Sequence, residues 1–313
     1  MTPLLLALGI GFAHARSTVV VLTSDDLPRY RTTATAFAAQ LGQPVEVVHI
    51  RGQREQAMRV AAALTADPPP LILALGEKAA WTAVHHGPTV PVVYAMVDDP
   101  DRYGIDGLFV TGVRADVQPD SVLAELRLYA PSVEHIGIII SAGNTSPRVG
   151  AAIAAAKEAG FTVSARRIGS SRDVKRAFGN IRNKVDALWV LPDEDVIDPS
   201  SFHYLRREAL RARMPMLAWS PALVQAGALM AVTADSDGVA AQAAALSQRV
   251  LDGEPAGGIR PVDPVATRVV LNRDTLESLG LDMEEGLLDF VDEVVRQPTP
   301  RGVSRCGSVS PSR

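Results

Sequence analysis

The sequence predicts an α/β protein with two lobes, each built on a parallel sheet. Two successive series of short apolar runs alternate with helical stretches along the chain. Apolar runs that do not alternate with polar residues are typical of strands covered on both faces, and the helices between them supply the crossovers that parallel strands need. Because ligands of open parallel sheets bind outside the carboxyl ends of the strands, the residues just after each strand are the candidates for function.

The first series predicts the first lobe. Its expected strands are Thr18–Thr23, Val45–Ile50, Leu71–Leu75 and Val92–Met96. Its expected helices are Arg31–Gln40, Arg54–Ala66, Lys78–Val84 and Ser121–Tyr129. Ala130-Pro131-Ser132 breaks the last of these helices, so this series ends near residue 130.

The second series predicts the second lobe, and the chain then crosses back. Its expected strands are His135–Ile140, Thr162–Arg167, Ala187–Leu191, Met216–Ala218 and Leu229–Val232. After them come a helix Asp235–Leu251 that stops at Asp252-Gly253-Glu254-Pro255, a strand Arg268–Asn272, and helices near Thr275–Leu279 and Glu284–Arg296. These extra elements suggest several crossings that form a hinge. We expect an N-terminal lobe of residues 16–130 plus 233–260 and a C-terminal lobe of residues 131–232 plus 261–297.

Composition favours a globular chain with small partners. Apolar residues make up 47% and charged residues 21% of the 313 residues, values typical of folded proteins with a sizeable core. The formal net charge of −4 offers no attraction to nucleic acid or to an anionic membrane surface. Small molecules or proteins are therefore the expected partners, and nucleic acid is not.

The first fifteen residues have the pattern of an export signal. The apolar stretch Leu4–Phe12 ends in Ala13-His14-Ala15, the small-x-small form that signal peptidase reads, so cleavage would leave Arg16 first. The stretch is too short to span a bilayer, which takes about 20 apolar residues. No lysine or arginine precedes Leu4, which is not typical of such signals, and the alternative is a buried N-terminus.

The number and position of cysteines indicate whether a disulfide or a lipid anchor is expected. The only cysteine, Cys306, lies in a tail of residues 298–313 that is rich in proline, serine and arginine and that we expect to be disordered. One cysteine cannot form an intramolecular disulfide, and none follows the leader to accept a lipid. The expected product is therefore exported to the periplasm, soluble and not lipid-anchored.

Three loops of the first lobe and three segments of the second are candidates for ligand binding, because each follows an expected strand. Those of the first lobe contain Ser24 and Asp25, then Gly76, Glu77 and Lys78, then Asp98. Those of the second contain Ser141, Asn144, Thr145 and Ser146, then Asp193 and Glu194, then Trp219. The alternative for the polar groups is helix capping or a solvated turn, since Ser, Asp and Asn accept hydrogen bonds from free amides in a first helical turn. Trp219 is interpreted as the floor of a ligand pocket.

Enzyme motifs are not found. Gly9-x-Gly11 falls within the leader, and the chain has no phosphate-binding Gly-x-x-x-x-Gly-Lys-Ser/Thr loop. His85-His86 is adjacent rather than spaced for a metal, and no Gly-x-Ser-x-Gly elbow occurs. We therefore expect no catalysis, no cofactor and no metal.

A set of short motifs in a fixed order carries a resemblance to a known family. They are Asp98-Asp99-Pro100, Val110-Thr111-Gly112-Val113, Tyr129-Ala130-Pro131, Ile136-Gly137-Ile138, Val185–Val190, Pro192-Asp193, Leu223–Ala228 and Leu251–Pro255. In these the chain resembles periplasmic substrate-binding proteins of ABC transporters, in the group that includes binders of tryptophan and other aromatic amino acids. The resemblance implies a type I periplasmic-binding-protein fold, with two three-layer lobes, three crossovers and a ligand enclosed by hinge closure.

The resemblance also implies roles for the loops. In members that bind amino acids, hydroxyl and amide groups hold the ligand carboxylate and an acid near Pro192-Asp193 holds the ammonium. Asp193 is then the expected polar anchor, with Ser24 and Asn144 beside it. The chain departs from the family at Glu77, Glu194 and Ser141-Ala142-Gly143, which favours a more basic or hydroxyl-rich solute.

The expected function is a monomeric solute-binding protein that delivers a small polar ligand to an inner-membrane ABC permease. One alternative is a sensory module that presents its ligand-bound lobes to a membrane receptor. Another is a cytoplasmic α/β enzyme such as a racemase or dehydrogenase, which requires that residues 1–15 be retained.

Overall fold

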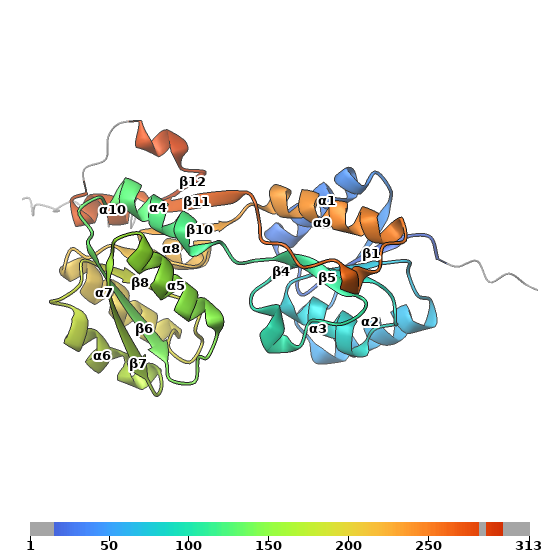
Figure 1. Ribbon diagram of the computed structural model, residues 1–313, viewed down its shortest axis with the longest axis horizontal. Coiled ribbons are helices and arrows are strands. Elements are labelled where there is room, and N and C mark those ends of the chain that lie inside the picture. The colour runs from blue at the N-terminus through green and yellow to red at the C-terminus, as the bar shows by residue number, and fades with distance from the viewer. Residues whose placement is uncertain (1–15, 282–285, 297–313) are drawn as a thin grey trace, which may run out of the picture. The chain divides into compact units, whose positions relative to one another are not determined.

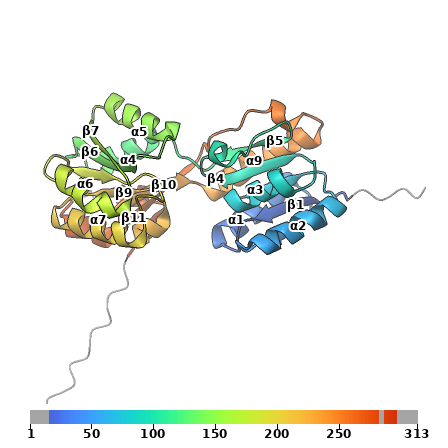
Figure 2. The same cartoon turned by 90° about the horizontal axis from the view of Figure 1, so that it is seen from below.

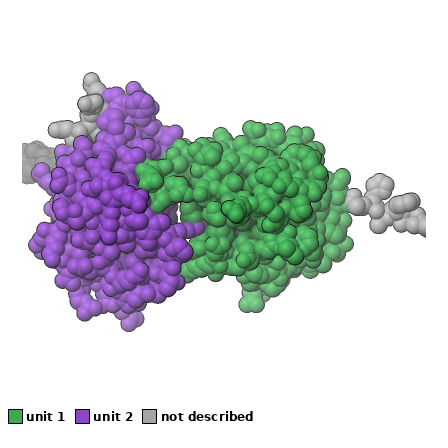
Figure 3. Space-filling model, viewed as in Figure 1, with its two compact units in different colours: residues 1–122, 233–268 green, residues 123–232, 269–313 purple. Residues whose placement is uncertain are grey.

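The structure is a computed structural model that describes residues 16–281 and 286–296. The expected leader at residues 1–15 and the expected tail at 298–313, with Cys306, lie outside the described residues. The chain divides into two compact units, each made of two separate stretches of sequence (Figure 3). Unit 1 is residues 1–122 with 233–268, and unit 2 is residues 123–232 with 269–313.

Unit 1 contains a five-stranded sheet with strand order β2-β1-β3-β4-β5. Every neighbouring pair is parallel. The strands are β1 (Val19–Thr23), β2 (Val45–His49), β3 (Ile72–Leu75), β4 (Val92–Val97) and β5 (Val110–Arg114). The helices are α1 (Pro28–Leu41), α2 (Arg54–Ala66), α3 (Glu77–His86) and α9 (Ser236–Leu251). Figure 1 shows β1, β4 and β5 between α1 and α9 on one side and α2 and α3 on the other. The predicted strands are present, and β5 is added to them.

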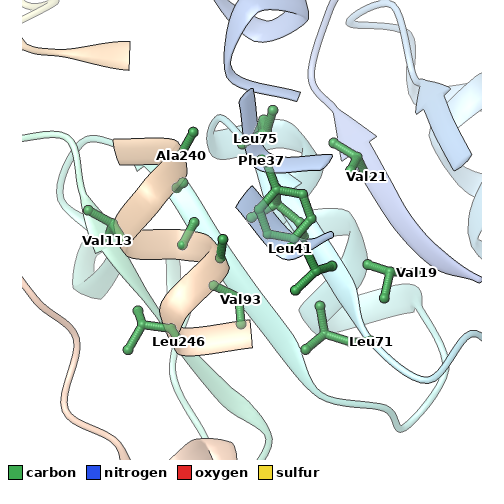
Figure 4. Packing of buried hydrophobic residues seen from close by; sticks show 14 of the residues in the cluster. Val19, Val21, Phe37, Leu41, Leu71, Leu75, Val93, Val113, Ala240 and Leu246 are labelled. Carbon is green, nitrogen blue, oxygen red and sulfur yellow. The ribbon is translucent and has the colours of Figure 1, made fainter. Parts of the chain in front are cut away.

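Helices cover both faces of the unit 1 sheet, which gives it three layers. Successive residues of β1 point to opposite faces, so Val19 and Val21 join one apolar cluster while Val20 and Leu22 join another. The first cluster is closed by α1 and α9, with Phe37 and Leu246 fully or nearly fully buried (Figure 4). The second cluster is closed by α2 and α3. A strand buried on both faces explains why β1 reads as an unbroken apolar run.

Unit 2 contains a seven-stranded sheet with strand order β12-β11-β10-β9-β8-β6-β7. Figure 2 labels β6, β7, β9, β10 and β11 of this sheet. The strands are β6 (His135–Ser141), β7 (Thr162–Ile168), β8 (Ala187–Trp189), β9 (Met216–Ala218), β10 (Met230–Ala234), β11 (Thr267–Asn272) and β12 (Glu293–Val295). The helices are α4 (Pro119–Tyr129), α5 (Pro147–Glu158), α6 (Val174–Ile181), α7 (Pro199–Arg211), α8 (Pro221–Gln225) and α10 (Arg273–Leu279). The pairs joining β9, β8, β6 and β7 are parallel, as are β9 with β10 and β11 with β12.

The unit 2 sheet is also covered on both faces. Ile139 packs with α6 and α7 in a cluster that includes Phe178 and Leu205. On the opposite face of the same strand, Ile138 and Ile140 are buried as well. Within the described residues, five α-helices start at a proline, whose fixed φ and missing amide suit the first helical position: α1, α4, α5, α7 and α8.

The end of the chain corrects one predicted element. The sequence pattern suggested a helix at Glu284–Arg296, but the described part holds a short 3-10 turn, Leu287–Phe290, followed by strand β12. Val294 pairs with Leu271 of β11 in parallel register. Pairing with an existing sheet edge therefore overrides the local helical pattern.

Residues 261–268 lie in unit 1, whereas the sequence grouped them with the second lobe. Val262 forms a parallel bridge with Val113 of β5, and the carboxylate of Asp263 accepts a hydrogen bond from Arg114 at 3.2 Å. These contacts attach the returning chain to the edge of the unit 1 sheet. Among the described residues, no helix is both long enough and apolar enough to cross a membrane.

Candidate functional site

Strand order places one candidate position in each unit. In the unit 1 sheet the strand order reverses at β1: β2 lies on one side of it, and β3, β4 and β5 follow on the other. Ligands of such sheets bind at this switch point between β1 and β3, outside the carboxyl ends of the strands. In unit 2 the corresponding change lies between β6 and β8. The loops that follow these four strands are among those that the sequence singled out.

In unit 1, the loops after β1 and β3 are tied together by Ser24. Its buried hydroxyl Oγ accepts a hydrogen bond from the backbone amide of Ala79 at 2.9 Å, so a residue after β1 caps the helix that follows β3. Gly76, which joins β3 to α3, has a φ of +87°. A Cβ at this position would collide with the Tyr30 hydroxyl and lie 2.7 Å from Ser24 Oγ. Only glycine fits this junction.

Tyr30 belongs to the same junction, although the sequence did not indicate it. The residue is buried in the first turn of α1, and its hydroxyl accepts a hydrogen bond from Arg29 at 3.1 Å. Burial raises the pKa of Tyr30, and the negative charge of Glu77 acts in the same direction, while Arg29 lowers it. The sequence pattern placed the start of this helix at Arg31; the signal that could have found Tyr30 is Pro28, which marks the first helical position.

Glu77 and Lys78 begin α3 and point to different parts of the sheet edge. The Glu77 carboxylate accepts a hydrogen bond from the backbone amide of Asp98 at 3.3 Å, which ties α3 to the end of β4. The Lys78 ammonium lies over the turn at Gly52, where an added Cβ would be 3.2 Å from Nζ and 3.9 Å from the Asp25 carboxylate. The edge of unit 1 thus presents an exposed ammonium beside the amino end of α3, where the helix dipole also favours a negative group.

Asp98 is exposed at the end of an irregular strand. The register of β4 against β5 shifts between Ala95 and Val97, and Met96 between them has a φ of +56°. Such a bulge bends the strand and changes the direction in which the next side chains point. The backbone irregularity in unit 1 therefore lies at the same edge as Ser24 and Gly76.

In unit 2, Asp193 ties together the loops after β6 and β8. It is 6% exposed, and its Oδ2 accepts hydrogen bonds from the backbone amide of Ser141 at 2.8 Å and from the Asn144 side chain at 3.0 Å. Its Oδ1 accepts from the backbone amide of Asp195 at 3.2 Å. The side-chain Oδ1 of Asn144 in turn accepts a hydrogen bond from the backbone amide of Ser146. Asp193 and Asn144 thus fix the loop conformation.

The other predicted residues of unit 2 take different positions. Ser141 is buried, and its hydroxyl has no hydrogen-bond partner within the described part of the chain. Ser146 accepts from the amide of Arg148 at 3.4 Å and caps α5, while Thr145 and Glu194 are exposed. Trp219 is half-buried and packs against the cluster formed with α6 and α7. The structure therefore brings Ser141, Asn144 and Asp193 together by hydrogen bonds and leaves Thr145 and Glu194 open to solvent.

Within residues 16–281 and 286–296, no group of three or more His, Cys, Asp or Glu side chains is placed to hold a metal ion. The exposed residues His85 and His86 contact the ring of Trp81 instead, with centroids 5.4 Å and 4.7 Å away.

Comparison with known proteins identifies the family. The family described as "ABC transporter substrate binding protein" matches residues 44–295. A tyrosine-binding protein of Clostridioides difficile is 25% identical over 230 residues, which are 71% of this chain and 66% of that protein. The match thus spans just under two thirds of the length of that relative.

Solved structures show the same fold. A ligand-free, open structure of a substrate-binding protein with adhesive properties from Clostridium difficile has a TM-score of 0.74 and 20% identity, covering 90% of this chain and all of that one. A complex with L-Trp from Streptococcus pneumonia has a TM-score of 0.64 and 20% identity, with the same coverage. A conserved domain protein from Vibrio cholerae has a TM-score of 0.63 at 20% identity, covering 89% of this chain and 99% of that one.

These matches confirm the predicted type I periplasmic-binding-protein fold and the resemblance on which that prediction was based. The family match also confirms the expectation of a protein that is not an enzyme, because the family is one of substrate-binding proteins. The chain belongs to the family of ABC transporter substrate-binding proteins.

Proposed function

We propose that this protein is the solute receptor of an ABC importer and captures an amino acid-like solute between its two units. The observation that carries the proposal is the construction of both switch points: a buried polar side chain, Ser24 in one unit and Asp193 in the other, fixes the two loops where a ligand of this fold binds. Loops fixed in this way lose little conformational entropy when a solute binds.

The chemistry of unit 1 suits the carboxylate of the solute. The backbone amides that open α3 and the ammonium of Lys78 supply donors and positive charge at one edge. A carboxylate at Glu77 would repel that of the solute, but it accepts a hydrogen bond from the amide of Asp98, which offsets part of its charge.

The chemistry of unit 2 suits the ammonium group. Asp193 Oδ1 accepts one backbone hydrogen bond, and a carboxylate oxygen has capacity for a second donor. Exposed Glu194 adds negative charge next to it. Trp219, half-buried after β9, offers an aromatic surface for the side chain of the solute.

Closure follows because each unit holds a different charged group of the solute. A solute that contacts only one unit has equal affinity for the open and closed forms and cannot shift their equilibrium. A solute held by its carboxylate in unit 1 and by its ammonium in unit 2 favours the closed form, which an inner-membrane permease then recognises. We place the protein in the periplasm as a soluble monomer, exported by the apolar leader.

A thermal-shift survey followed by titration calorimetry tests the proposal. L-Tyrosine and L-tryptophan are the first probes, because they are bound by the relatives named above. Lysine, arginine, a polyamine, a nucleoside and a sugar complete the survey. A solute at about 100 times its dissociation constant should stabilise the folded form by about 2.7 kcal/mol. A survey in which no amino acid shifts the unfolding midpoint would overturn the proposed ligand class.

Two variants at neighbouring positions then test the site. Asp193→Asn should weaken binding of the identified solute by roughly tenfold or more, since a hydrogen bond to a charged group contributes about 1.5–3 kcal/mol. The matched control is Asp195→Asn, which removes an exposed carboxylate two residues away and should leave affinity within about twofold. Small-angle scattering with and without the solute measures closure, and identical profiles would contradict it.

A further inference from the structure

Unit 2 contains a hollow of about 230 Å³ at the end of the sheet opposite to the candidate solute site. Its walls come from residues just before β6, β8 and β9 and just after α6, α7 and α10. They include Ser132, Arg182, Asp186, Arg213, Met214 and Leu281. Ser141 ends β6 and Asp193 follows β8, so both residues lie at the carboxyl ends of these strands. The hollow lies at the amino ends, so the length of the strands separates it from Ser141 and Asp193.

Arg213 occupies a position where the fold favours glycine. It follows α7 with a φ of +52°; its amide bonds to the carbonyl of Leu210 at 3.1 Å, and the next amide, of Met214, bonds to Ala209 at 2.9 Å. This pair of bonds is the helix-ending motif in which a left-handed residue, usually glycine, stands just after the helix.

The same motif ends four other helices of the described chain, α5, α8, α9 and α10, each time with a glycine. These are Gly160, Gly227, Gly253 and Gly280. The left-handed conformation is unfavourable for a residue with a Cβ, so α7 retains a strained arginine where glycine would relieve the strain. The helix end itself does not require a side chain there, so an arginine at this position indicates a role for what its side chain reaches.

The guanidinium groups of Arg182 and Arg213 are open to a ligand. Both side chains are exposed, and neither guanidinium makes a hydrogen bond or an ion pair among the described residues. Arg213 Nη1 lies 4.0 Å from the point where a Cβ on Gly280 would stand, so the absence of a side chain there leaves room beside it.

Asp186 supplies the one carboxylate among the described lining residues, and that carboxylate already has hydrogen-bond partners. Asp186 Oδ2 accepts hydrogen bonds from the backbone amides of Glu134 at 3.0 Å and His135 at 2.9 Å, and lies 3.5 Å from the His135 ring. Two arginines therefore face one carboxylate that already has partners. Among the described residues that line the hollow, the net charge is therefore positive.

We propose that this hollow binds a small oxyanion, a molecule that carries a carboxylate or phosphate group, held between Arg182 and Arg213. A guanidinium presents several N–H donors in a planar fork that matches the oxygens of both groups. The proposal does not depend on the identity of the transported solute, because the site lies at the opposite end of the unit 2 sheet.

Titration calorimetry at constant ionic strength tests it, with inorganic phosphate in one arm and citrate in the other, so that the two kinds of oxyanion are distinguished. Binding of one anion per chain is expected. Arg213→Gly should weaken it by roughly tenfold or more, while the thermal unfolding midpoint without anion stays unchanged or rises because the strain is relieved. Arg182→Gln should weaken binding similarly. The matched control, Arg211→Gln, removes an arginine that is paired with Glu208 in the last turn of α7, and should leave binding unchanged.

Three outcomes would overturn the proposal. If neither phosphate nor citrate bound the wild-type protein, the hollow would not be an anion site. If Arg211→Gln weakened binding as much as Arg213→Gly, the effect would reflect general surface charge. If Arg213→Gly lowered the unfolding midpoint and left anion binding intact, the arginine would serve to offset the dipole of α7 instead.

Discussion

The carboxylate of Asp193 accepts a hydrogen bond from the backbone amide of Ser141 at 2.8 Å, so the loop after β8 holds the end of β6. Unit 1 uses the same device in a different chemical form, with the Ser24 hydroxyl accepting from the amide of Ala79. In each unit a buried polar side chain crosses the switch point of the sheet. The two units thus use different residues for the same result, a pair of loops fixed to each other at the edge where this fold binds solutes.

Asp193 should matter for stability as well as for binding. Asp193→Ala leaves the buried amide of Ser141 and the side chain of Asn144 without their acceptor, and we expect a loss of about 2 kcal/mol or more in the free energy of unfolding. Urea denaturation monitored by tryptophan fluorescence measures it. Asp195→Ala serves as control and should change stability by less than about 0.5 kcal/mol. Equal losses in the two variants would contradict the bridging role.

Gly76→Ala should be strongly destabilising, because the added methyl group collides with Tyr30 and Ser24 and the backbone has a φ of +87°. A loss of about 2 kcal/mol or more is expected from the strained conformation and the forced movement. Gly150→Ala is the matched control. That position lies in α5 with open space around the new Cβ, so the same change there should stabilise by about 0.5–1 kcal/mol. Opposite signs in thermal unfolding would support the assignment.

Tyr129→Phe should not destabilise the protein. The Tyr129 side chain is 1% exposed, and its hydroxyl has no hydrogen-bond partner within residues 16–281 and 286–296. Removing an unsatisfied buried hydroxyl is expected to be neutral or to stabilise by about 1 kcal/mol. Tyr30→Phe, which breaks a hydrogen bond with Arg29, should instead cost about 0.5–1.5 kcal/mol. A loss of stability in Tyr129→Phe equal to that in Tyr30→Phe would show that its hydroxyl is satisfied.

Stability should fall at alkaline pH. Burial raises the pKa of both Tyr94 and Tyr129 to about 12, above the value near 10 of an unfolded chain. A raised pKa means that the folded state holds the proton more tightly, so this contribution is complete below pH 10 and is lost as pH rises from about 10 to 12. Urea denaturation at pH 8, 10 and 11 measures the slope. The double variant Tyr94→Phe/Tyr129→Phe should have a flatter slope, and an unchanged slope would contradict the prediction.

The sequence predicted the sheets well because their strands are buried on both faces. The runs at β1 and β3 are apolar without interruption, and no solvated face hides the pattern. The helix suggested at Glu284–Arg296 was wrong because its described end pairs with β11, a contact that no local pattern encodes.

The positions of the candidate loops could be predicted, but the directions of their side chains could not. Residues after strands are placed by topology, so Ser24 and Asp193 could be selected without coordinates. Whether Glu77 faces a ligand or the amide of Asp98 depends on the bend of β4 at Met96, which has a left-handed φ rarely taken by methionine. Tyr30 was missed because a buried aromatic residue in a first helical turn looks like ordinary core.

The return of the chain to unit 1 has a consequence for synthesis. Helix α9 supplies Val239, Ala243 and Leu246 to the apolar cluster that α1 shares with β1, yet α9 leaves the ribosome only after the whole of residues 123–232. Until α9 is synthesised, the apolar residues of the first part of unit 1 that α9 covers stay exposed, and unit 1 cannot complete its fold. Unit 1, although it begins first, is expected to mature late, and a fragment ending at residue 122 should be prone to aggregation.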